Sequence, residues 1–590
     1  MENKQFIRNE KLIRQKYREY LIPSVFTAAA LSLASVVDSA IVGNLVGTEE
    51  LGGIGACSPV IALINAFFLL FTIGGATKAS ISLGERNTEK ANQCFSISIL
   101  LGLAISAVFI VVMLVLAEPV CYLLAGRDEG LAAYVIQYYR PILFVFPALF
   151  MTIGMSQYMR IDGYPKMASY IALVSNAVNL VLDYCLIRFA GFGLTGASLS
   201  TVLGYVAGIG LVIPYLFSKK RSFRFVNPFK NEFFPRMGEI LSGGSSRFFL
   251  NISDFFKRSI MNLLVVFYLG NPGLSVLTIC NSLLLFSTAV TKGGSDAFLP
   301  IIGSLHGEKD QFGIRKCFKS AITFVLIGCL VLMLVMLIAP AFVGGLFGVD
   351  EGRAGEIIPG AIRMLALALP VMGINSNLQT LYNTTGRAKL ASTMSILSGI
   401  AYLCLYAFLL PMINSDFFWL AFVCSEVTTF LTAMLIGRII RKKEGAVGYL
   451  LLKKPDPDEK RVSYTIEADS QAAGRLARLV KQAALDMELD SIQANRIALA
   501  VEEMTVAVAE ANTGRKRKPL IDIGIVRAGE ETVVSFRENA KPCNLLLPDP
   551  ENPPNENSGI EVFRKAATSV EYSRQLGFNT IVAKFERSVV

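Results

Sequence analysis

Twelve long apolar runs are the feature that most restricts how this chain can fold. They lie at roughly 20–55, 52–83, 91–117, 131–158, 166–190, 192–218, 238–268, 272–303, 314–340, 356–382, 389–412 and 414–437. Each run is long enough to cross a bilayer, which takes about 20 apolar residues. A composition of 53% hydrophobic and 17% charged residues also excludes an ordinary soluble protein. We therefore predict an α-helical polytopic membrane protein with twelve transmembrane helices.

The basic residues predict the orientation of these helices. Lys and Arg gather in every second loop, whereas the loops between carry few of them. Because cytoplasmic loops hold the excess of Lys and Arg, this alternation places both termini in the cytoplasm. The same loops account for the net charge of +10, so we predict no nucleic-acid partner.

The two halves of the apolar region repeat each other at a constant offset of 223 residues, the separation of Gly47 from Gly270. The same offset relates Gly84 to Gly307, and it also pairs Cys94 with Cys317, Arg140 with Arg363, Pro147 with Pro370 and Gly163 with Gly386. Equal spacing across six spans predicts two six-helix lobes of parallel topology. The predicted organisation is a basic lead-in (1–19), an N-lobe (20–218), a cytoplasmic loop (219–236) and a C-lobe (237–441).

Two acids lie within apolar runs of the first half. Asn179 and Asp183 are four residues apart, so they share one face of a helix, and Asp38 lies in the first run. A carboxylate at membrane depth costs roughly 2.5–3.5 kcal/mol and is expected to face a bundle interior or a wet cavity. We interpret the acids as a site for a cation or proton; the alternative is a structural polar pair that holds helices together.

The repeat lacks this polar set in its second half. At the offset of 223, Asp38 corresponds to Met261, Asn179 to Tyr402, Asp183 to Tyr406 and Thr201 to Cys424. Acids that only stabilised the repeated fold would be expected in both halves. Their presence in one half favours a functional ion site there.

Several motifs resemble those of the multidrug and toxic compound extrusion (MATE) transporters. They are LIPSVFTAAALSLASVVDSAIVGNLVG from Leu21, GYPK at the start of the fifth run, and GLTGASLST. The resemblance covers about residues 10–441 and implies alternating access of two lobes, driven by sodium or proton entry. It implies a first-lobe cation site at Asp38, Asn179, Asp183 and Thr201, with sodium, if used, held by Asp38, Asn179 and Asp183. Asp254 is the candidate for a second-lobe polar site, although Lys257 and Arg258 follow it as alternative partners.

The composition changes after the last run. A Pro- and charge-rich linker occupies 442–461, and the segment 462–590 alternates strand-like and helix-like patterns. We expect strands at 462–467, 521–526, 532–537 and 580–585, and amphipathic helices at 472–487 and 492–510. The length suits one soluble α/β domain.

This segment resembles the histidine-kinase-like ATPase domains of serine-kinase anti-sigma factors. RIALAVEEMTVAVAEAN, ENAKPCNLLLP and SGIEVFRKAATSVEYSRQLGFNTIVAKF carry the resemblance, which implies an α/β sandwich. In that family a glutamate is followed four residues later by a magnesium-binding asparagine. Here Glu503 is followed by Ala507, so a hard oxygen ligand is missing.

The adenine-binding motif of that family is altered too. Its Asp-x-Gly stretch appears as Glu538, Asn539 and Ala540, and only Gly559 remains of the glycine-rich lid. We therefore predict a degenerate domain that does not use ATP. It would regulate the membrane region or bind a cytoplasmic protein partner; the alternative is an inert appendage.

Together these patterns predict an antiporter that exports amphipathic or cationic small molecules across the cytoplasmic membrane of a bacterium. We predict that no cofactor is required beyond the coupling sodium ion or proton. The sequence contains no intact set of catalytic residues, so we do not predict an enzyme. Two alternatives stay open: a membrane sensor that signals through the C-terminal domain, and a flippase for lipids or polysaccharide precursors with the same broad fold. The sequence does not name the substrate, because such cavities accept many ligands.

Overall fold

The structure is a computed structural model of the chain. It describes residues 10–45, 54, 56–125, 129–218, 221–229, 232–340, 352–445, 448–452, 459–512, 518–528, 531–540, 544, 546, 561, 564–565 and 567–586. Two compact units are present: Tyr17–Leu452 forms the helical unit, and Lys453–Val590 together with Met1–Lys16 forms the soluble unit.

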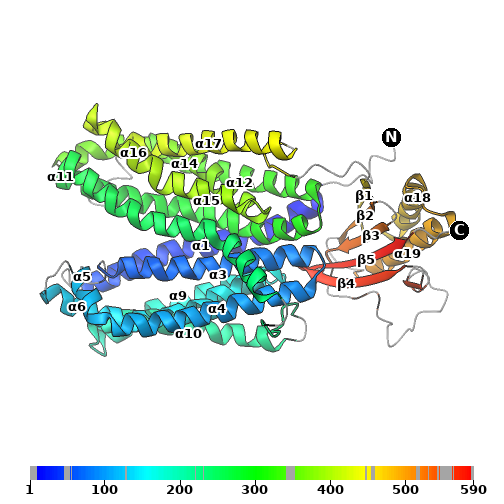
Figure 1. Cartoon of the computed structure of the whole chain (residues 1–590), viewed down its shortest axis with the longest axis horizontal. Coiled ribbons are helices and arrows are strands. Elements are labelled where there is room, and N and C mark those ends of the chain that lie inside the picture. Colours follow the sequence, from blue (N-terminus) through cyan, green and yellow to red (C-terminus); the bar gives the residue numbers. More distant parts are fainter. Residues whose placement is uncertain are drawn as a thin grey trace. The chain divides into compact units, whose positions relative to one another are not determined.

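The regular elements described for the helical unit are all helices (Figure 1). The first half contains α1 (Lys11–Leu45), α3 (Ser58–Gly84), α4 (Thr88–Val115), α5 (Ala117–Leu124), α6 (Glu129–Ile142), α7 (Val145–Leu149), η2 (Phe150–Gly154), α8 (Met155–Ile161), α9 (Pro165–Arg188) and α10 (Gly193–Phe217). The second half contains α11 (Phe233–Gly307), α12 (Gln311–Ile338), α14 (Gly352–Thr384), α15 (Ala388–Ile396), η3 (Leu397–Ala401), α16 (Tyr402–Leu409), η4 (Leu410–Met412), η5 (Ser415–Trp419) and α17 (Leu420–Glu444). In Figure 1 the helices of each half group together as a lobe.

The predicted runs coincide with these helices. Among the described residues, 8 helices are long and apolar enough to cross a membrane, or up to 9 if the bent pair Ala132–Ile142 and Val145–Ile161 is one span. Of the three remaining runs, one lies on α1 and two lie on α11. Those two meet at Gly270, where φ is 69° and ψ is −164°, a conformation open to glycine but strained for other residues. A multi-pass helical fold is thus confirmed, and twelve membrane crossings stay a prediction.

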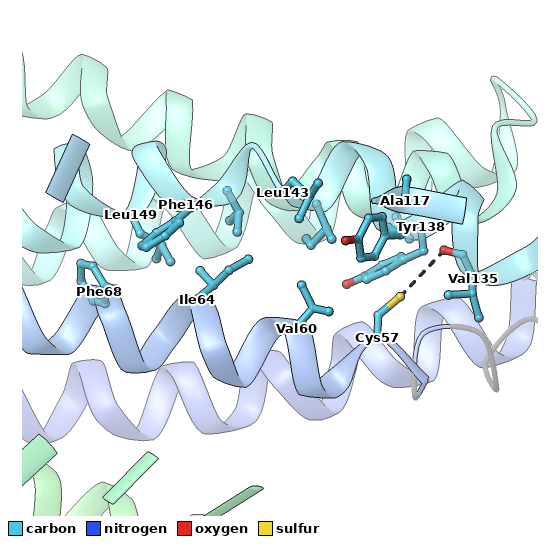
Figure 2. Packing of buried hydrophobic residues seen from close by; sticks show 14 of the residues in the cluster. Cys57, Val60, Ile64, Phe68, Ala117, Val135, Tyr138, Leu143, Phe146 and Leu149 are labelled. Carbon is cyan, nitrogen blue, oxygen red and sulfur yellow. Dashed lines mark hydrogen bonds between the residues drawn. The ribbon is translucent and has the colours of Figure 1, made fainter. Parts of the chain in front are cut away.

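Each lobe is held by its own apolar core. In the first lobe, Val60, Ile64 and Phe68 on α3 face Phe146 and neighbouring side chains of the α6–α7 region (Figure 2). All four are at most 4% exposed. The core of the second lobe is separate and involves α11, α12, α14, α16 and α17.

The repeat is visible where the two lobes touch along α3 and α11. A Cβ atom on Gly84 would lie 2.0 Å from the carbonyl oxygen of Ser304, and one on Gly307 would lie 2.1 Å from that of Ile81. At the offset of 223, Ser304 is the repeat equivalent of Ile81, and Gly307 is the repeat equivalent of Gly84. The same two positions of the repeat therefore meet twice, once with the glycine from each half. Such reciprocal contacts are the mark of a two-fold axis between the helices. We call the contact of α3 with α11 the lobe seam.

An ion pair crosses between the lobes near this seam. Arg160 of α8 lies 3.7 Å from Asp296 of α11, with side chains 7% and 17% exposed. The same carboxylate interacts electrostatically with Arg247, which also donates to the hydroxyl of Thr380 at 3.0 Å. Asp296 therefore balances arginines from both lobes.

The soluble unit contains one antiparallel sheet of order β1-β2-β3-β5-β4. Its strands are β1 (Glu459–Glu467), β2 (Leu520–Ala528), β3 (Glu531–Glu538), β4 (Ser569–Gln575) and β5 (Phe578–Glu586). Two helices, α18 (Ser470–Asp486) and α19 (Ser491–Glu510), share one apolar core with the sheet. Each helix starts at an aspartate cap, Asp469 or Asp490, whose side chain accepts a backbone N–H.

The strands and helices predicted for this segment are present, with one omission. The hydrophobic pattern predicts four strands, but the sheet has a fifth, β4. Its sequence, SVEYSRQ, has too few apolar residues to be recognised alone. Among the described strands it pairs with β5 alone and lies at one edge of the sheet. The α/β architecture is established, and a kinase-like ATPase fold stays a prediction.

The first turns of α1 belong to the soluble unit. Lys11 lies 3.9 Å from Glu467, and the ammonium of Lys16 lies 4.6 Å from the centre of the Phe578 ring. Leu12 and Ile13 between them are 1% and 4% exposed. The basic lead-in thus includes part of a packed element.

Candidate cation site in the first lobe

The site is built on the close approach of α9 and α10. Small residues recur every four positions on α10, at Gly196, Ser200, Gly204 and Gly208. A Cβ atom on Gly204 would lie 2.5 Å from the carbonyl oxygen of Ser175 and 2.8 Å from the Cβ of Asn179. Small residues at this spacing let membrane helices pack backbone against backbone. As a result, the polar side chains of both helices meet without intervening apolar groups.

Four polar side chains form the cluster. The side-chain nitrogen of Asn179 donates to Asp183 Oδ2 at 3.1 Å and lies 3.4 Å from both Ser200 Oγ and Thr201 Oγ1. The hydroxyl of Ser200 donates to the other carboxylate oxygen, Asp183 Oδ1. Asp183 and Ser200 are 0% exposed. The cluster thus holds a carboxylate that is buried but hydrogen-bonded on both oxygens, as a charge at this depth requires.

The structure brings together three of the residues that the sequence predicts, namely Asn179, Asp183 and Thr201. It adds Ser200, which we did not predict. The four-residue spacing of small residues around Ser200 could have identified it, because that stripe marks the face of α10 that meets α9.

The remaining predicted acids lie outside the part of the chain whose side chains are described. Asp38 is on α1 and Asp254 is on α11, but the positions of both side chains fall outside that description. No group of three or more His, Cys, Asp or Glu side chains suited to a metal occurs among the described residues. Asp183, Asn179, Ser200 and Thr201 instead offer one carboxylate and neutral oxygens, which a sodium ion or a proton can use.

The equivalent region of the second lobe is chemically different. Tyr402 and Tyr406 stand where Asn179 and Asp183 lie in the first lobe, and their hydroxyls bond to Thr432 at 3.1 Å and Thr428 at 2.9 Å. These neutral pairs join the helices without a carboxylate. The asymmetry predicted from the repeat is therefore present among these described residues.

The predicted nucleotide positions of the soluble unit are partly described. Glu503 and Ala507 lie on α19, and Gly559 lies outside the described residues. Glu538, 2% exposed, accepts hydrogen bonds from the backbone of Ala540 and from the side chain of Asn579. Its carboxylate, at the position that the predicted resemblance aligns with an adenine-binding aspartate, is thus already bonded within the chain.

Asn539 is also engaged within the soluble unit. Its side-chain oxygen accepts the backbone N–H of Leu520 at 2.7 Å. This bond ties the turn after β3 to the start of β2, so the amide has a structural use that needs no ligand.

Two repeated lobes of long apolar helices, with a buried carboxylate cluster in one of them, define a multi-pass membrane protein. The sequence model of the MatE family matches residues 23–185 and 251–406, more than half of the chain. The chain therefore belongs to the MatE family, whose members are secondary transporters and not enzymes.

Curated relatives and solved structures agree with this membership. The chain is 23% identical over 433 residues to the multidrug export protein MepA of Staphylococcus aureus, covering 72% of this chain and 93% of the relative. MepA of Staphylococcus saprophyticus is 22% identical over 428 residues, with the same coverage. The fold resembles that of a mutant of the Vibrio cholerae MATE transporter VcmN, with a TM-score of 0.67, 20% identity, and coverage of 73% of this chain and 98% of that one. An outward-facing MATE family transporter gives a TM-score of 0.68 at 18% identity, covering 73% and 96%.

Proposed function

We propose that this protein is a cation-coupled antiporter that exports amphipathic or cationic small molecules across the cytoplasmic membrane of a bacterium. The observation that carries the proposal is the buried cluster of Asn179, Asp183, Ser200 and Thr201. A carboxylate at that depth is costly, and its absence from the equivalent position of the second lobe argues against a purely structural role. The names of the MepA relatives, which describe multidrug export, support the substrate class.

Binding at this cluster would change its charge. An empty, ionised Asp183 relies on Asn179 and Ser200 as hydrogen-bond donors. A proton or sodium ion would neutralise the carboxylate and take over part of those interactions. A ligand shifts a conformational equilibrium only by its difference in affinity between two states. The ion would therefore favour one arrangement of the lobes, which would rock about the loop at 219–236 and open or close the lobe seam.

Asp183→Asn tests the proposal in proteoliposomes. The variant keeps the shape of the side chain but cannot ionise, so we expect ion-driven substrate export to fall to background while the protein stays folded. Asp38→Asn is expected to act in the same direction. Asp416→Asn, at an exposed acid, provides the matched control and should export normally. Undiminished export by Asp183→Asn under both sodium and proton gradients would refute the assignment.

The soluble unit has a proposed regulatory role in the same transporter. Its support is the packing of the first turns of α1 within this unit, because α1 is also the helix that carries Asp38. A chain lacking residues 462–590 should still bind substrate but export it at an altered rate. A sensor would behave differently, since it would show ligand binding but no ion-driven flux in the full chain.

A further inference from the structure

The second lobe holds an ionisable group of its own, away from the positions that the repeat equates with the first-lobe cluster. Glu426 lies on α17, six residues after the helix begins, in a span with few charges. The side-chain nitrogen of Asn375, on α14, donates to Glu426 Oε2 at 2.6 Å and to the carbonyl oxygen of Glu426 at 2.9 Å. The repeat equivalents of these residues are Leu203 and Thr152, so the pair belongs to one lobe only.

The surroundings of this carboxylate lie inside the lobe. Lys257 of α11 interacts with it electrostatically, and the same lysine acts on Cys404 of α16. The exposed side chains Val427, Leu431 and Leu435 mark another face of α17. On the side towards α16, the hydroxyls of Tyr402 and Tyr406 bond to threonines of α17. Among the described side chains, Glu426 therefore faces one ammonium and one amide.

A second observation points to an exchangeable ligand here. Asn375 is 2% exposed, and its side-chain oxygen has no hydrogen-bond partner among the described residues. Leaving a buried acceptor unpaired costs about 1–3 kcal/mol, so the oxygen calls for a donor. A protonated carboxyl group on Glu426 is such a donor, after the Asn375 amide turns over by half a rotation and gives up its hydrogen bond to the backbone carbonyl oxygen of Glu426.

From this geometry we propose that Glu426 and Asn375 form a proton-exchange site in the second lobe. When Glu426 is ionised, Asn375 donates its N–H to the carboxylate and Lys257 balances the charge. When Glu426 takes up a proton, the new O–H donates to Asn375 Oδ1, and the carboxyl group no longer attracts Lys257 as an anion. Both protonation states thus have a hydrogen-bond partner in the same residue.

The same features argue against a metal ion at this site. Sodium needs several oxygen ligands, yet here an N–H points at one carboxylate oxygen and an ammonium lies nearby. Both repel a second cation but leave a proton free to bind. In the proposed antiporter, the site would add a proton to the coupling stoichiometry. This contribution rests on the proposed function, whereas proton exchange at Glu426 does not.

Infrared spectroscopy of the full chain in lipid nanodiscs, titrated with acid, tests the site directly. Glutamate labelled with carbon-13 separates its carboxyl signals from those of aspartate. Asp183→Asn serves as the parent, so that a failure of the first-lobe assignment cannot affect the result. We expect the parent to gain a carboxylic acid C=O band on acidification that is missing in the double variant with Glu426→Gln.

The second variant and the ion control make the outcome decisive. Asn375→Leu removes the acceptor, so the acid band should move to higher frequency, as for a carboxyl group that loses its hydrogen bond. Adding sodium at fixed pH should leave the band unchanged. A Glu426-dependent band that never appears while the protein stays folded would show a permanent ion pair and overturn the proposal. Loss of the band on adding sodium would overturn it too, because it would identify a metal site.

Discussion

Replacing Gly84 by alanine should push the two lobes apart. The new Cβ would lie 2.0 Å from the oxygen and 2.8 Å from the carbon of the Ser304 carbonyl, and 2.9 Å from the Cα of Gly307. All three are backbone atoms of α11, so no side-chain rotation relieves the clash. Ordinary contact begins at about 3.4 Å, and the helices at the lobe seam must therefore separate by more than an ångström.

The size of the effect follows from the cost of overpacking. An extra carbon in a tight contact costs roughly 1–3 kcal/mol. If the seam opens in the alternative arrangement of the lobes, that arrangement escapes the cost. Since about 1.4 kcal/mol is a tenfold change in an equilibrium, the ratio of open to closed seams should rise by roughly 5- to 150-fold.

Distances between labels on the two lobes measure this ratio. Position 89 on α4 and position 312 on α12 are exposed repeat equivalents. Each lies in the first turn of the helix that follows a seam glycine, Gly84 or Gly307. Labels on non-canonical amino acids avoid the ten native cysteines. Gly84→Ala should increase the long-distance population at the expense of the short one.

Gly238→Ala is the matched control for this experiment. It adds the same methyl group to α11, where nothing lies within 4 Å, and so reports the helix-propensity gain of alanine alone. Its distance distribution should equal that of the unmodified protein. A Gly84→Ala protein with lowered thermal stability but an unchanged distribution would refute the reasoning, because the seam would then be closed in both arrangements.

Three further predictions follow from the described contacts. Ser200→Ala removes a hydrogen bond, worth about 1.5–3 kcal/mol, that stabilises the ionised, ion-free Asp183, so the apparent affinity for a coupling proton should rise tenfold or more in transport assays. Ser198→Ala, whose hydroxyl donates to the carbonyl oxygen of Thr195, should not change it, and a lowered proton affinity in Ser200→Ala would contradict the reasoning. Asp296→Asn leaves Arg160 without its partner across the seam, at a cost of up to about 3–5 kcal/mol. The distances between labels at positions 89 and 312 should therefore lengthen, and an unchanged distance distribution would count against a gating role. In calorimetry, the full chain should bind Mg-ATP only at about millimolar concentration, and the double variant Ala507→Asn, Ala540→Gly should bind it more tightly. Micromolar binding by the unmodified chain would contradict the prediction.

Much of the fold could be predicted because hydrophobic length and periodicity determine it. Apolar runs predict the membrane helices, and alternation predicts β1, β2, β3 and β5. The edge strand β4 depends on its single neighbour for pairing, so its own sequence carries a weak signal. The two apolar runs within α11 are separate helices that meet at a kink at Gly270, whose backbone angles suit glycine.

The site was harder to predict in full. Asn179 and Asp183 share a helix, and their spacing alone brings them together. Ser200 lies on the neighbouring helix, and its contact depends on how far α10 is rotated against α9, which the glycine stripe determines. Glu426 and Asn375 come from helices far apart in sequence, and comparing equivalent positions of the repeat finds only copies of the first site.

The placement of shared and unshared residues has a geometric cause. Near the two-fold axis, a position of the first half contacts the second half at the place where its equivalent contacts the first half. A residue type at such a position must therefore fit both contacts. This explains why the glycines of the lobe seam, Gly84 and Gly307, are the same in both repeats. Residues away from the axis have no such constraint, and Asp183 in one lobe and Glu426 in the other have diverged from their equivalents, Tyr406 and Leu203. A protein built this way can keep a symmetric lobe seam while its two lobes carry different ionisable groups. The seam and the two carboxylate sites should therefore respond independently to mutation, except where ion binding shifts the lobes themselves.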